Sequence, residues 1–176
     1  MNYQQKLINI HNYKNIFLDR DGIINEVIVR ESGISSPRKV SEFIFRQDFI
    51  EFMRGISDDK LFFVVTNQPE IKRGLLNEEV LLHFHNIINK TFTIKKIIYC
   101  PHDDIDKCNC RKPLPGMINA VITEYKLNRS ECLFIGDSHK DMLAATAANI
   151  EAVLLKTNYN KPFRELPFID LLVNLL

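Results

Sequence analysis

Two apolar runs of the sequence end in closely spaced aspartates. Asp19 and Asp21 follow the run NIFL, and Asp137 follows the run CLFIG, with Asp141 one helical turn further on. Carboxylates at the end of a buried strand are costly unless a cation or a proton compensates their charge. Taken alone, Asp19 and Asp21 would fit a turn at Gly22, and Asp137 and Asp141 would fit the cap of a helix. Together, at one edge of a parallel sheet, they would suit Mg²⁺, which prefers oxygen ligands and completes its shell with water and phosphate.

A hydroxyl, an amide and a lysine extend this pattern. The apolar run LFFVV ends in Thr66 and Asn67, whose side chains can bind phosphate oxygens, although polar strand ends are also common without a ligand. Lys112 offers a point charge that can neutralise a phosphate. Pro113 disfavours a helical conformation at Lys112, so the lysine is expected in an extended loop just before a helix. The combination of these elements, in order along the chain, is far more specific than any of them alone.

Four soft or borderline metal ligands lie within eleven positions of the sequence: Cys100, His102, Cys108 and Cys110. This set suits tetrahedral Zn²⁺, and a site closed by four protein ligands would be structural, because no position is left for a reactive water. The C-x-C pair is tighter than the usual finger spacing, so a disulfide or a redox pair stays open on the ligands alone. A metal here would fix the loop that carries Arg111 and Lys112. Cys132, at the start of an apolar run, is expected to be a small buried hydrophobe.

The elements that must position these residues alternate between short apolar runs and longer segments of helical period. The short runs are apolar at nearly every position, as in strands buried on both faces of a parallel sheet. We expect a single α/β domain over residues 1–176, a doubly wound (Rossmann-like) three-layer sandwich with a central parallel sheet. The expected strands are 15–19, 61–67, 95–100, 132–137 and 151–156, and the expected helices are 47–58, 77–91, 115–126, 139–148 and an amphipathic tail near 166–176.

Residues 26–46 fit this alternation least well. The segment follows the first strand directly, where an insertion would overhang the carboxyl ends of the sheet strands. Ligands of open α/β sheets bind at that edge, so we expect this segment to lie beside the ligand site.

The bulk composition is that of a soluble globular protein. Of the 176 residues, 45% are hydrophobic and 26% are charged, and the formal net charge of +1 gives no broad electrostatic reason to expect nucleic acid or an acidic membrane as a partner. The first residues lack the apolar core of a signal peptide, and no run approaches the roughly 18 apolar residues of a membrane span. We therefore expect a cytoplasmic monomer with a small-molecule partner. Its thiols would stay reduced, which weighs against a disulfide.

The motifs DRDG, TN, RKP and GDSHKD resemble, in this order, the four motifs of the haloacid dehalogenase (HAD) superfamily of phosphohydrolases. The resemblance spans residues 15–157. The segment CPH…CNCRKP narrows it to a zinc-containing subfamily that includes heptose-bisphosphate phosphatases and histidinol-phosphate phosphatases. The segments SPRKVSEFIF, TNQ, KPLPGM and DMLAATAANI look more like the heptose branch.

The resemblance implies a two-step hydrolysis through an aspartyl-phosphate. Asp19 would attack phosphorus, and Asp21 would protonate the leaving alcohol and then activate the water that cleaves the intermediate. Mg²⁺ would be held by Asp19, Asp137 and the backbone carbonyl of Asp21, and a structural Zn²⁺ would be held by the cysteine–histidine cluster.

Contacts with the phosphate and the substrate are implied for a second group of residues. Thr66 and Lys112 would bind the phosphate oxygens, and Asp141 would orient Lys112 or a metal-bound water. The further substrate-binding candidates are Asn67, Arg111 and Arg30. The implied substrate is a sugar phosphate, a heptose 1,7-bisphosphate that loses its 7-phosphate in the supply of nucleotide-heptose for surface polysaccharide. The alternatives are histidinol phosphate or, from another class, a catalytically silent HAD-fold binding protein.

The sequence departs from the family pattern at three places. Ile23 stands where the first motif usually carries Thr, Pro69-Glu70 stand where Ser-Gly is common, and Ser138 replaces a Lys often found after the fourth-motif Asp. None of these changes removes a catalytic group. The last two alter the charge close to where a sugar phosphate would bind.

Overall fold

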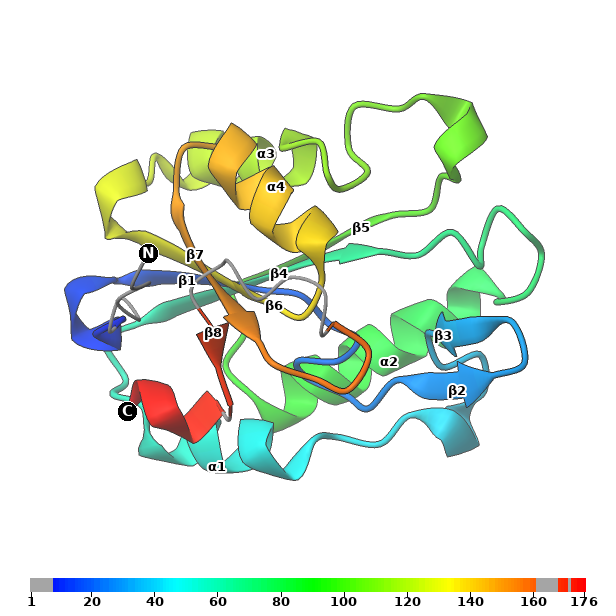
Figure 1. Cartoon of the computed structure of the whole chain (residues 1–176), viewed down its shortest axis with the longest axis horizontal. Coiled ribbons are helices and arrows are strands. Elements are labelled where there is room, and N and C mark those ends of the chain that lie inside the picture. Colours follow the sequence, from blue (N-terminus) through cyan, green and yellow to red (C-terminus); the bar gives the residue numbers. More distant parts are fainter. Residues whose placement is uncertain (1–7, 161–167, 171) are drawn as a thin grey trace, which may run out of the picture.

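The structure, a computed structural model, describes residues 8–160, 168–170 and 172–176. Six parallel strands form the main sheet in the order β5-β4-β1-β6-β7-β8, and β2 and β3 form a separate antiparallel hairpin (Figure 1). The strands are β1 (Asn15–Leu18), β2 (Ile28–Arg30), β3 (Gly33–Ser35), β4 (Leu61–Asn67), β5 (Lys96–Cys100), β6 (Cys132–Gly136), β7 (Glu151–Leu155) and β8 (Phe168–Ile169). All the strands expected from the sequence form, with ends that differ by at most one residue.

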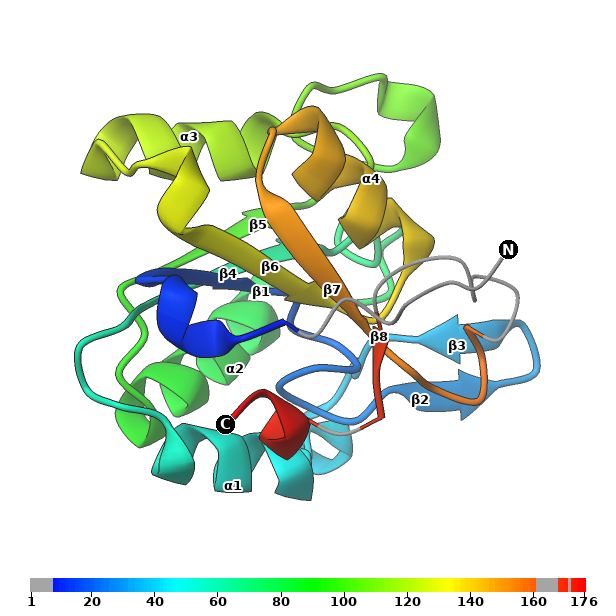
Figure 2. The same cartoon turned by 60° about the vertical axis from the view of Figure 1, so that its left-hand side comes forward.

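Two helices cover each face of the main sheet, which confirms the predicted three-layer sandwich (Figures 1 and 2). The first pair is α1 (Gln47–Gly55) and α2 (Glu78–Thr91), and the opposite face carries α3 (Gly116–Tyr125) and α4 (His139–Ala147). A capping box begins α4, in which the side chains of Ser138 and Asp141 each accept from the other residue's backbone N–H. Within the described ranges, every helix is too short or too polar to cross a bilayer.

The strands are apolar on consecutive positions because the helices bury both faces. In β1, Ile16 and Leu18 join the core under α1 and α2, with Phe49 of α1. Phe17 points to the opposite face and joins a second core with Ile118 of α3. Alternate side chains of a strand point to opposite faces, so a run without polar positions is what a sheet covered on both sides requires.

The sheet order brings the carboxyl ends of three strands together. β1 lies between β4 and β6, with Leu18 opposite Val64 on one side and Ile135 on the other. The residues that follow β1 and β6, and those that end β4, therefore meet at one edge, as expected for the ligand edge of an open α/β sheet.

The predicted insertion at residues 26–46 forms the β2–β3 hairpin beyond this edge (Figure 2). It is tied down at its base, where Asn25 bridges Phe45 in antiparallel fashion and also bridges Asp21. The expectation that this segment lies beside the carboxyl ends of the strands is confirmed.

The prediction of an amphipathic helix at 166–176 is wrong for the residues that the structure describes there. Residues 166, 167 and 171 lie outside the described ranges. Phe168 and Ile169 instead form β8, the edge strand beside β7. Leu172–Leu175 follow as a 3-10 helix, and Leu172 and Leu175 are buried in the core that α1 covers. The free edge of β7 offers unpaired backbone N–H and C=O groups, and only an extended segment can pair with them. This pairing outweighs the helical periodicity of so short a segment.

Candidate active site

Three carboxylates converge where β1 and β6 end. Asp19 follows β1, Asp137 follows β6 and Asp141 lies in the first turn of α4. One oxygen from each of them lies within 4.8 Å of the others. The structure thus brings together the aspartates that the sequence places at two separate strand ends.

A buried lysine lies between two of these carboxylates. The Nζ atom of Lys112 is 2.9 Å from Oδ1 of Asp19 and 2.6 Å from Oδ1 of Asp141, and it also donates to the carbonyl of Val65 at 2.9 Å. Burial alone lowers the pKa of Lys112, but the charges of Asp141 and Asp19 outweigh it and raise the pKa above its ordinary value. Lys112 is therefore a permanent cation inside the cluster.

One lysine does not neutralise three carboxylates. Burial raises the pKa of Asp19 to about 7, although the charge of Lys112 opposes the shift. Burial, followed by the charges of Asp19 and Asp141, also raises the pKa of Asp137 well above its ordinary value. Carboxylates held this close hold protons unless a further cation joins them. An all-oxygen donor set with excess negative charge fits a hard divalent cation.

Two polar residues at the end of β4 border the cluster. Thr66 is buried, and its hydroxyl accepts from Nε2 of Gln68 at 2.9 Å. The side chain of Asn67 binds the backbone of Lys112 at both ends: Nδ2 donates to the carbonyl, and Oδ1 accepts from the N–H, each at 3.0 Å. The side chain of Asn67 thus holds the Lys112 loop in place, and the phosphate contact predicted for its amide stays a prediction.

The carboxylate of Asp21 is surrounded by hydrogen-bond donors. Asn25 donates to Oδ1 at 2.9 Å, and Ser36 and Gln68 donate to Oδ2 at 2.8 and 2.7 Å. Nη2 of Arg20 lies 2.9 Å from both oxygens. Burial alone raises the pKa of Asp21, but the charge of Arg20 and the hydrogen bonds from Asn25 and Ser36 outweigh it and hold the pKa below its ordinary value. Asp21 is therefore ionised at neutral pH.

Arg20 is fully buried behind Asp21. It also donates to Oε1 of Gln68 at 3.0 Å and lies 3.5 Å from Nε2 of His85. Burial and the charge of Arg20 lower the pKa of His85 to about 3, so this imidazole is neutral. Sequence reasoning assigns no site role to Arg20, Gln68 or His85, although Arg20 stands between two motif aspartates and Gln68 belongs to the family-like segment TNQ.

Asp137 is fixed by two residues that follow β7. The hydroxyl of Tyr159 donates to Oδ2 of Asp137 at 2.6 Å, and Asn160 donates to its backbone carbonyl at 2.9 Å. Gly22 has a φ of +85°, and a Cβ there would lie 1.9 Å from Oδ2 of Asp137, so only glycine permits this approach. Sequence reasoning also misses Tyr159 and Asn160, because no motif surrounds them.

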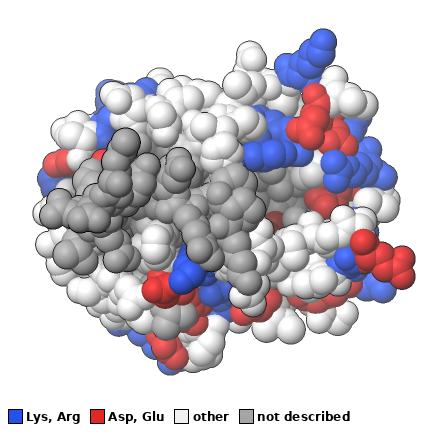
Figure 3. All heavy atoms as spheres, in the orientation of Figure 1, with Lys and Arg blue, Asp and Glu red and all other residues white. Residues whose placement is uncertain are grey.

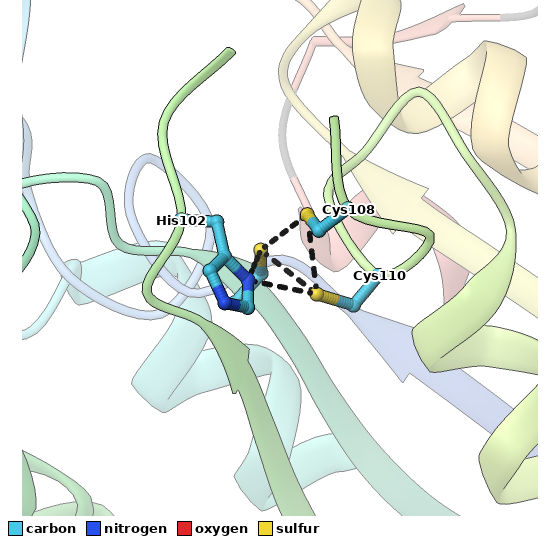
Figure 4. A group of neighbouring side chains, drawn as sticks. His102, Cys108 and Cys110 are labelled. Carbon is cyan, nitrogen blue, oxygen red and sulfur yellow. Dashed lines mark hydrogen bonds between the residues drawn. The ribbon is translucent and has the colours of Figure 1, made fainter. Parts of the chain in front are cut away.

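The four predicted zinc ligands, Cys100, His102, Cys108 and Cys110, form a compact cluster at and just after the end of β5. Figure 4 labels three of them, His102, Cys108 and Cys110. One ligand atom from each lies within 4.8 Å of the others. The sulfur of Cys110 is 3.1 Å from that of Cys100, and Nδ1 of His102 is 3.3 Å from the sulfur of Cys110.

All four cysteines of the chain are free, which argues against the disulfide alternative. The shortest sulfur–sulfur distance is 3.1 Å, far beyond the roughly 2.05 Å of a disulfide bond. Burial raises the pKa of Cys100. At Cys108, burial is outweighed by hydrogen bonds to the backbone of Arg111 and to neighbouring thiols, and the pKa falls to about 7. Three sulfurs and one imidazole in this space fit a closed tetrahedral metal site.

The predicted substrate-binding arginines are engaged in ion pairs. Arg111 donates to Oδ1 of Asp104 at 2.7 Å and to the carbonyl of His102 at 3.2 Å. Arg30, in β2, donates to Oε2 of Glu42 at 2.7 Å. A substrate would have to compete with these partners, so the contacts predicted for Arg111 and Arg30 stay predictions.

The surface over the hairpin and the loop after β5 carries charges of both signs (Figure 3). Asp103 and Asp106 of that loop pair with the segment between β4 and α2: Arg73 lies 2.6 Å from Asp103, and Lys72 lies 3.4 Å from Asp106. The local charges thus compensate one another at the surface, and the excess of negative charge lies in the buried carboxylate cluster.

The parallel sheet and the acids at its strand ends define a phosphohydrolase of the HAD type, and residues 109–167 match the family described as HAD-hydrolase-like. A D-glycero-alpha-D-manno-heptose-1,7-bisphosphate 7-phosphatase from Campylobacter jejuni is 33% identical over 154 residues, which cover 84% of this chain and 85% of that protein. The chain therefore belongs to the HAD-like phosphatases, which are phosphomonoester hydrolases.

A second relative and a solved structure carry names of the same kind. A D-glycero-beta-D-manno-heptose-1,7-bisphosphate 7-phosphatase from Pseudomonas aeruginosa is 34% identical over 148 residues, covering 81% of this chain and 80% of that protein. The crystal structure of a D,D-heptose 1,7-bisphosphate phosphatase from B. bronchiseptica, complexed with magnesium and phosphate, superposes with a TM-score of 0.79 at 26% identity. The superposition covers 92% of this chain and 94% of that one.

Proposed function

We propose that this protein is a Mg²⁺-dependent phosphatase that removes the 7-phosphate of D-glycero-D-manno-heptose 1,7-bisphosphate through an aspartyl-phosphate on Asp19. The observation that carries the proposal is the buried group of Lys112 with Asp19 and Asp141, next to Asp137. The relatives named for this substrate match over at least 80% of both chains, which supports the choice of sugar.

Asp19 acts as the nucleophile in the first step. The charge of Lys112 opposes the effect of burial on the pKa of Asp19 and so increases the fraction that is ionised. Attack forms a bond between a carboxylate oxygen and phosphorus, while the bond from phosphorus to the sugar oxygen breaks. The hydroxyl of Thr66 and the ammonium of Lys112 bind the other phosphate oxygens as negative charge develops on them.

Asp21 moves the protons. A bound phosphate dianion raises the pKa of this carboxyl by like-charge repulsion, which lets Asp21 carry a proton to the leaving sugar oxygen. Once the alcohol has left, Asp21 is ionised and takes a proton from the water that attacks the aspartyl-phosphate. The donors around its oxygens, from Arg20, Asn25, Ser36 and Gln68, favour this ionised form and orient it.

The two proposed metal sites have different roles, one catalytic and one structural. Mg²⁺, held by Asp19, Asp137 and the carbonyl of Asp21, would offset the repulsion between the anionic nucleophile and the phosphate. Zn²⁺ would be held by the cysteine–histidine cluster and would be structural. Because Cys110 directly precedes Arg111 and Lys112, that cluster fixes the loop from which the lysine reaches the carboxylates.

The cellular setting follows from the same chemistry. We place the enzyme in the cytoplasm, where thiols stay reduced and available to zinc. We propose that it acts as a monomer on a free sugar phosphate, in the supply of nucleotide-heptose for lipopolysaccharide.

The proposal is tested by Mg²⁺-dependent phosphate release from both anomers of the heptose 1,7-bisphosphate and from histidinol phosphate, in parallel. A preference of at least 100-fold in kcat/KM for one heptose anomer is expected, which corresponds to about 2.7 kcal/mol of differential transition-state binding. Phosphorus NMR of the product should show that the 1-phosphate remains. A preference for histidinol phosphate would move the enzyme to the other branch of its subfamily, and no turnover of any phosphomonoester would leave only a binding role.

A further inference from the structure

The β2–β3 hairpin links Asp21 to a second polar group, Glu70. Ser36, which follows β3, donates to Oδ2 of Asp21 at 2.8 Å, and Oγ of the adjacent Ser35 lies 3.5 Å from Oε1 of Glu70. Glu70 follows Gln68 by two residues, and Gln68 donates to the same oxygen of Asp21 at 2.7 Å. Glu70 is therefore one layer of side chains away from the general acid.

Glu70 is buried with fewer partners than a carboxylate needs. The residue is 5% exposed, and its Oε2 atom has no hydrogen-bond partner among the described residues. Its ion-pair partner is Arg38, with Nη2 3.9 Å from Oε1. The Nε atom of Arg38 is likewise buried without a hydrogen-bond partner in the described part of the chain. Leaving such atoms unpaired is costly, so the pair offers one unused acceptor and one unused donor.

The position of Glu70 and Arg38 relative to Asp21 suggests a role in binding the leaving alcohol. The phosphate must lie at Asp19 and Lys112, and Asp21 must reach the oxygen that joins phosphorus to the alcohol. The carbon chain of the alcohol therefore starts at Asp21 and continues away from the carboxylate cluster. The hairpin and the loop that carries Glu70 contact Asp21 through the hydrogen bonds of Ser36 and Gln68.

We propose that Glu70 and Arg38 form a subsite for hydroxyl groups of the leaving alcohol, which makes the enzyme selective for polyol phosphates; this rests on the proposed phosphatase function. A hydroxyl both donates and accepts, so it satisfies Oε2 of Glu70 and Nε of Arg38. An ionised phosphate has no proton to donate and is repelled by Glu70, whereas an ammonium is repelled by Arg38. The pair therefore matches a neutral polyol segment better than either ion.

The subsite explains one departure of the sequence from its family pattern. Glu70 stands where the resembling sequences commonly carry glycine, which has no side chain to bind a hydroxyl. The acid thus adds a substrate contact without touching Asp19, Asp21 or Lys112 directly.

Glu70→Ala and Glu70→Gln test the proposal with three substrates: the heptose 1,7-bisphosphate, sorbitol 6-phosphate, and phenyl phosphate, which lacks hydroxyls. The matched control is Glu131→Gln, because Glu131 pairs with Lys14 at the opposite edge of the sheet. A lost hydrogen bond to a charged group predicts that Glu70→Ala raises KM for both polyol phosphates about 10- to 100-fold. The change in kcat, and in kcat/KM for phenyl phosphate, should stay within about threefold, and Glu70→Gln should lie in between.

Two results would overturn the subsite. An equal loss on phenyl phosphate would show that Glu70 acts through Asp21 or the fold, and an unchanged KM for the polyol phosphates would show that it makes no such contact. Thermal unfolding of the isosteric Glu70→Gln variant checks that the fold is kept. If the unaltered enzyme hydrolyses sorbitol 6-phosphate but not the heptose bisphosphate, with a KM that depends on Glu70, the heptose assignment fails while the subsite stands.

Discussion

The ammonium of Lys112 lies 2.9 Å from the carboxylate of Asp19, and only 2% of the lysine side chain is exposed. The same atom also contacts Asp141 at 2.6 Å. The lysine proposed to bind the phosphate is therefore, in the free protein, the counter-ion of the proposed nucleophile. This double role explains why Asn67 uses both ends of its side chain to hold the Lys112 backbone.

Replacing Lys112 with Met should reduce both activity and stability. It leaves Asp19 and Asp141 without their cation, which costs about 3–5 kcal/mol for a buried pair. Burial raises the pKa of Asp19 to about 7, and its protonation relieves part of this cost, so the loss of unfolding free energy without Mg²⁺ should be larger at pH 8 than at pH 5. Urea unfolding at the two pH values measures it. An equal loss at both values would mean that Lys112 acts by packing and not by charge.

Tyr159→Phe should weaken Mg²⁺ binding. The variant removes the hydroxyl that orients Asp137 at 2.6 Å, and loss of such an orienting contact typically weakens metal binding about 10- to 100-fold. Calorimetric titration with Mg²⁺ measures the affinity without turnover. Tyr99→Phe is the control, because the Tyr99 hydroxyl bonds Glu78 away from the cluster. Equal affinities in Tyr159→Phe and the control would show that Asp137 does not depend on Tyr159.

Cys108→Ser should lower the zinc content from about one ion per chain and loosen the loop before Lys112. Activity should fall with it, and added Mg²⁺ should not restore it, because the defect lies in the loop. Metal analysis together with phosphate release provides the measurement. Cys132→Ser, outside the cluster, should keep its zinc. Full activity of a zinc-free Cys108→Ser variant would contradict the structural role.

Stability should depend on pH through His85. Its pKa is about 3 in the folded protein and 6.5 in the unfolded chain, so between these values the unfolded state binds a proton that the folded state excludes. The contribution of His85 to the unfolding free energy is therefore fully present above pH 6.5. It falls as the pH drops towards 3, by at most about 1.4 kcal/mol per pH unit. His85→Gln cannot titrate and should lose stability less steeply over this window. Parallel curves for the two proteins in urea titrations would show that burial and the charge of Arg20 do not hold His85 neutral.

Strand ends were predictable because their signals are local. An apolar run that ends in Asp19, Thr66 or Asp137 identifies both a buried strand and the group at its carboxyl end, and the parallel order then brings these groups together. The cysteine–histidine cluster is also local, since its ligands lie in one loop.

The contacts missed by sequence reasoning join distant segments. Tyr159 reaches Asp137 across 22 positions, and Gln68 reaches Asp21 across 47. Such pairs depend on how loops fold back over the sheet edge, which no spacing in the chain encodes. The helix predicted for the C-terminal segment is wrong for a related reason. Phe168 and Ile169 pair with β7, whose free edge exists only once the sheet has assembled.

The most direct test of the account is phosphate release by Asp19→Asn, measured beside the unaltered enzyme at saturating Mg²⁺. The amide cannot form an aspartyl-phosphate, so the rate should fall by about four orders of magnitude or more while zinc content and fold are kept. Substantial residual turnover by a folded, zinc-loaded Asp19→Asn variant would contradict nucleophilic catalysis by Asp19, and with it the central claim for this site.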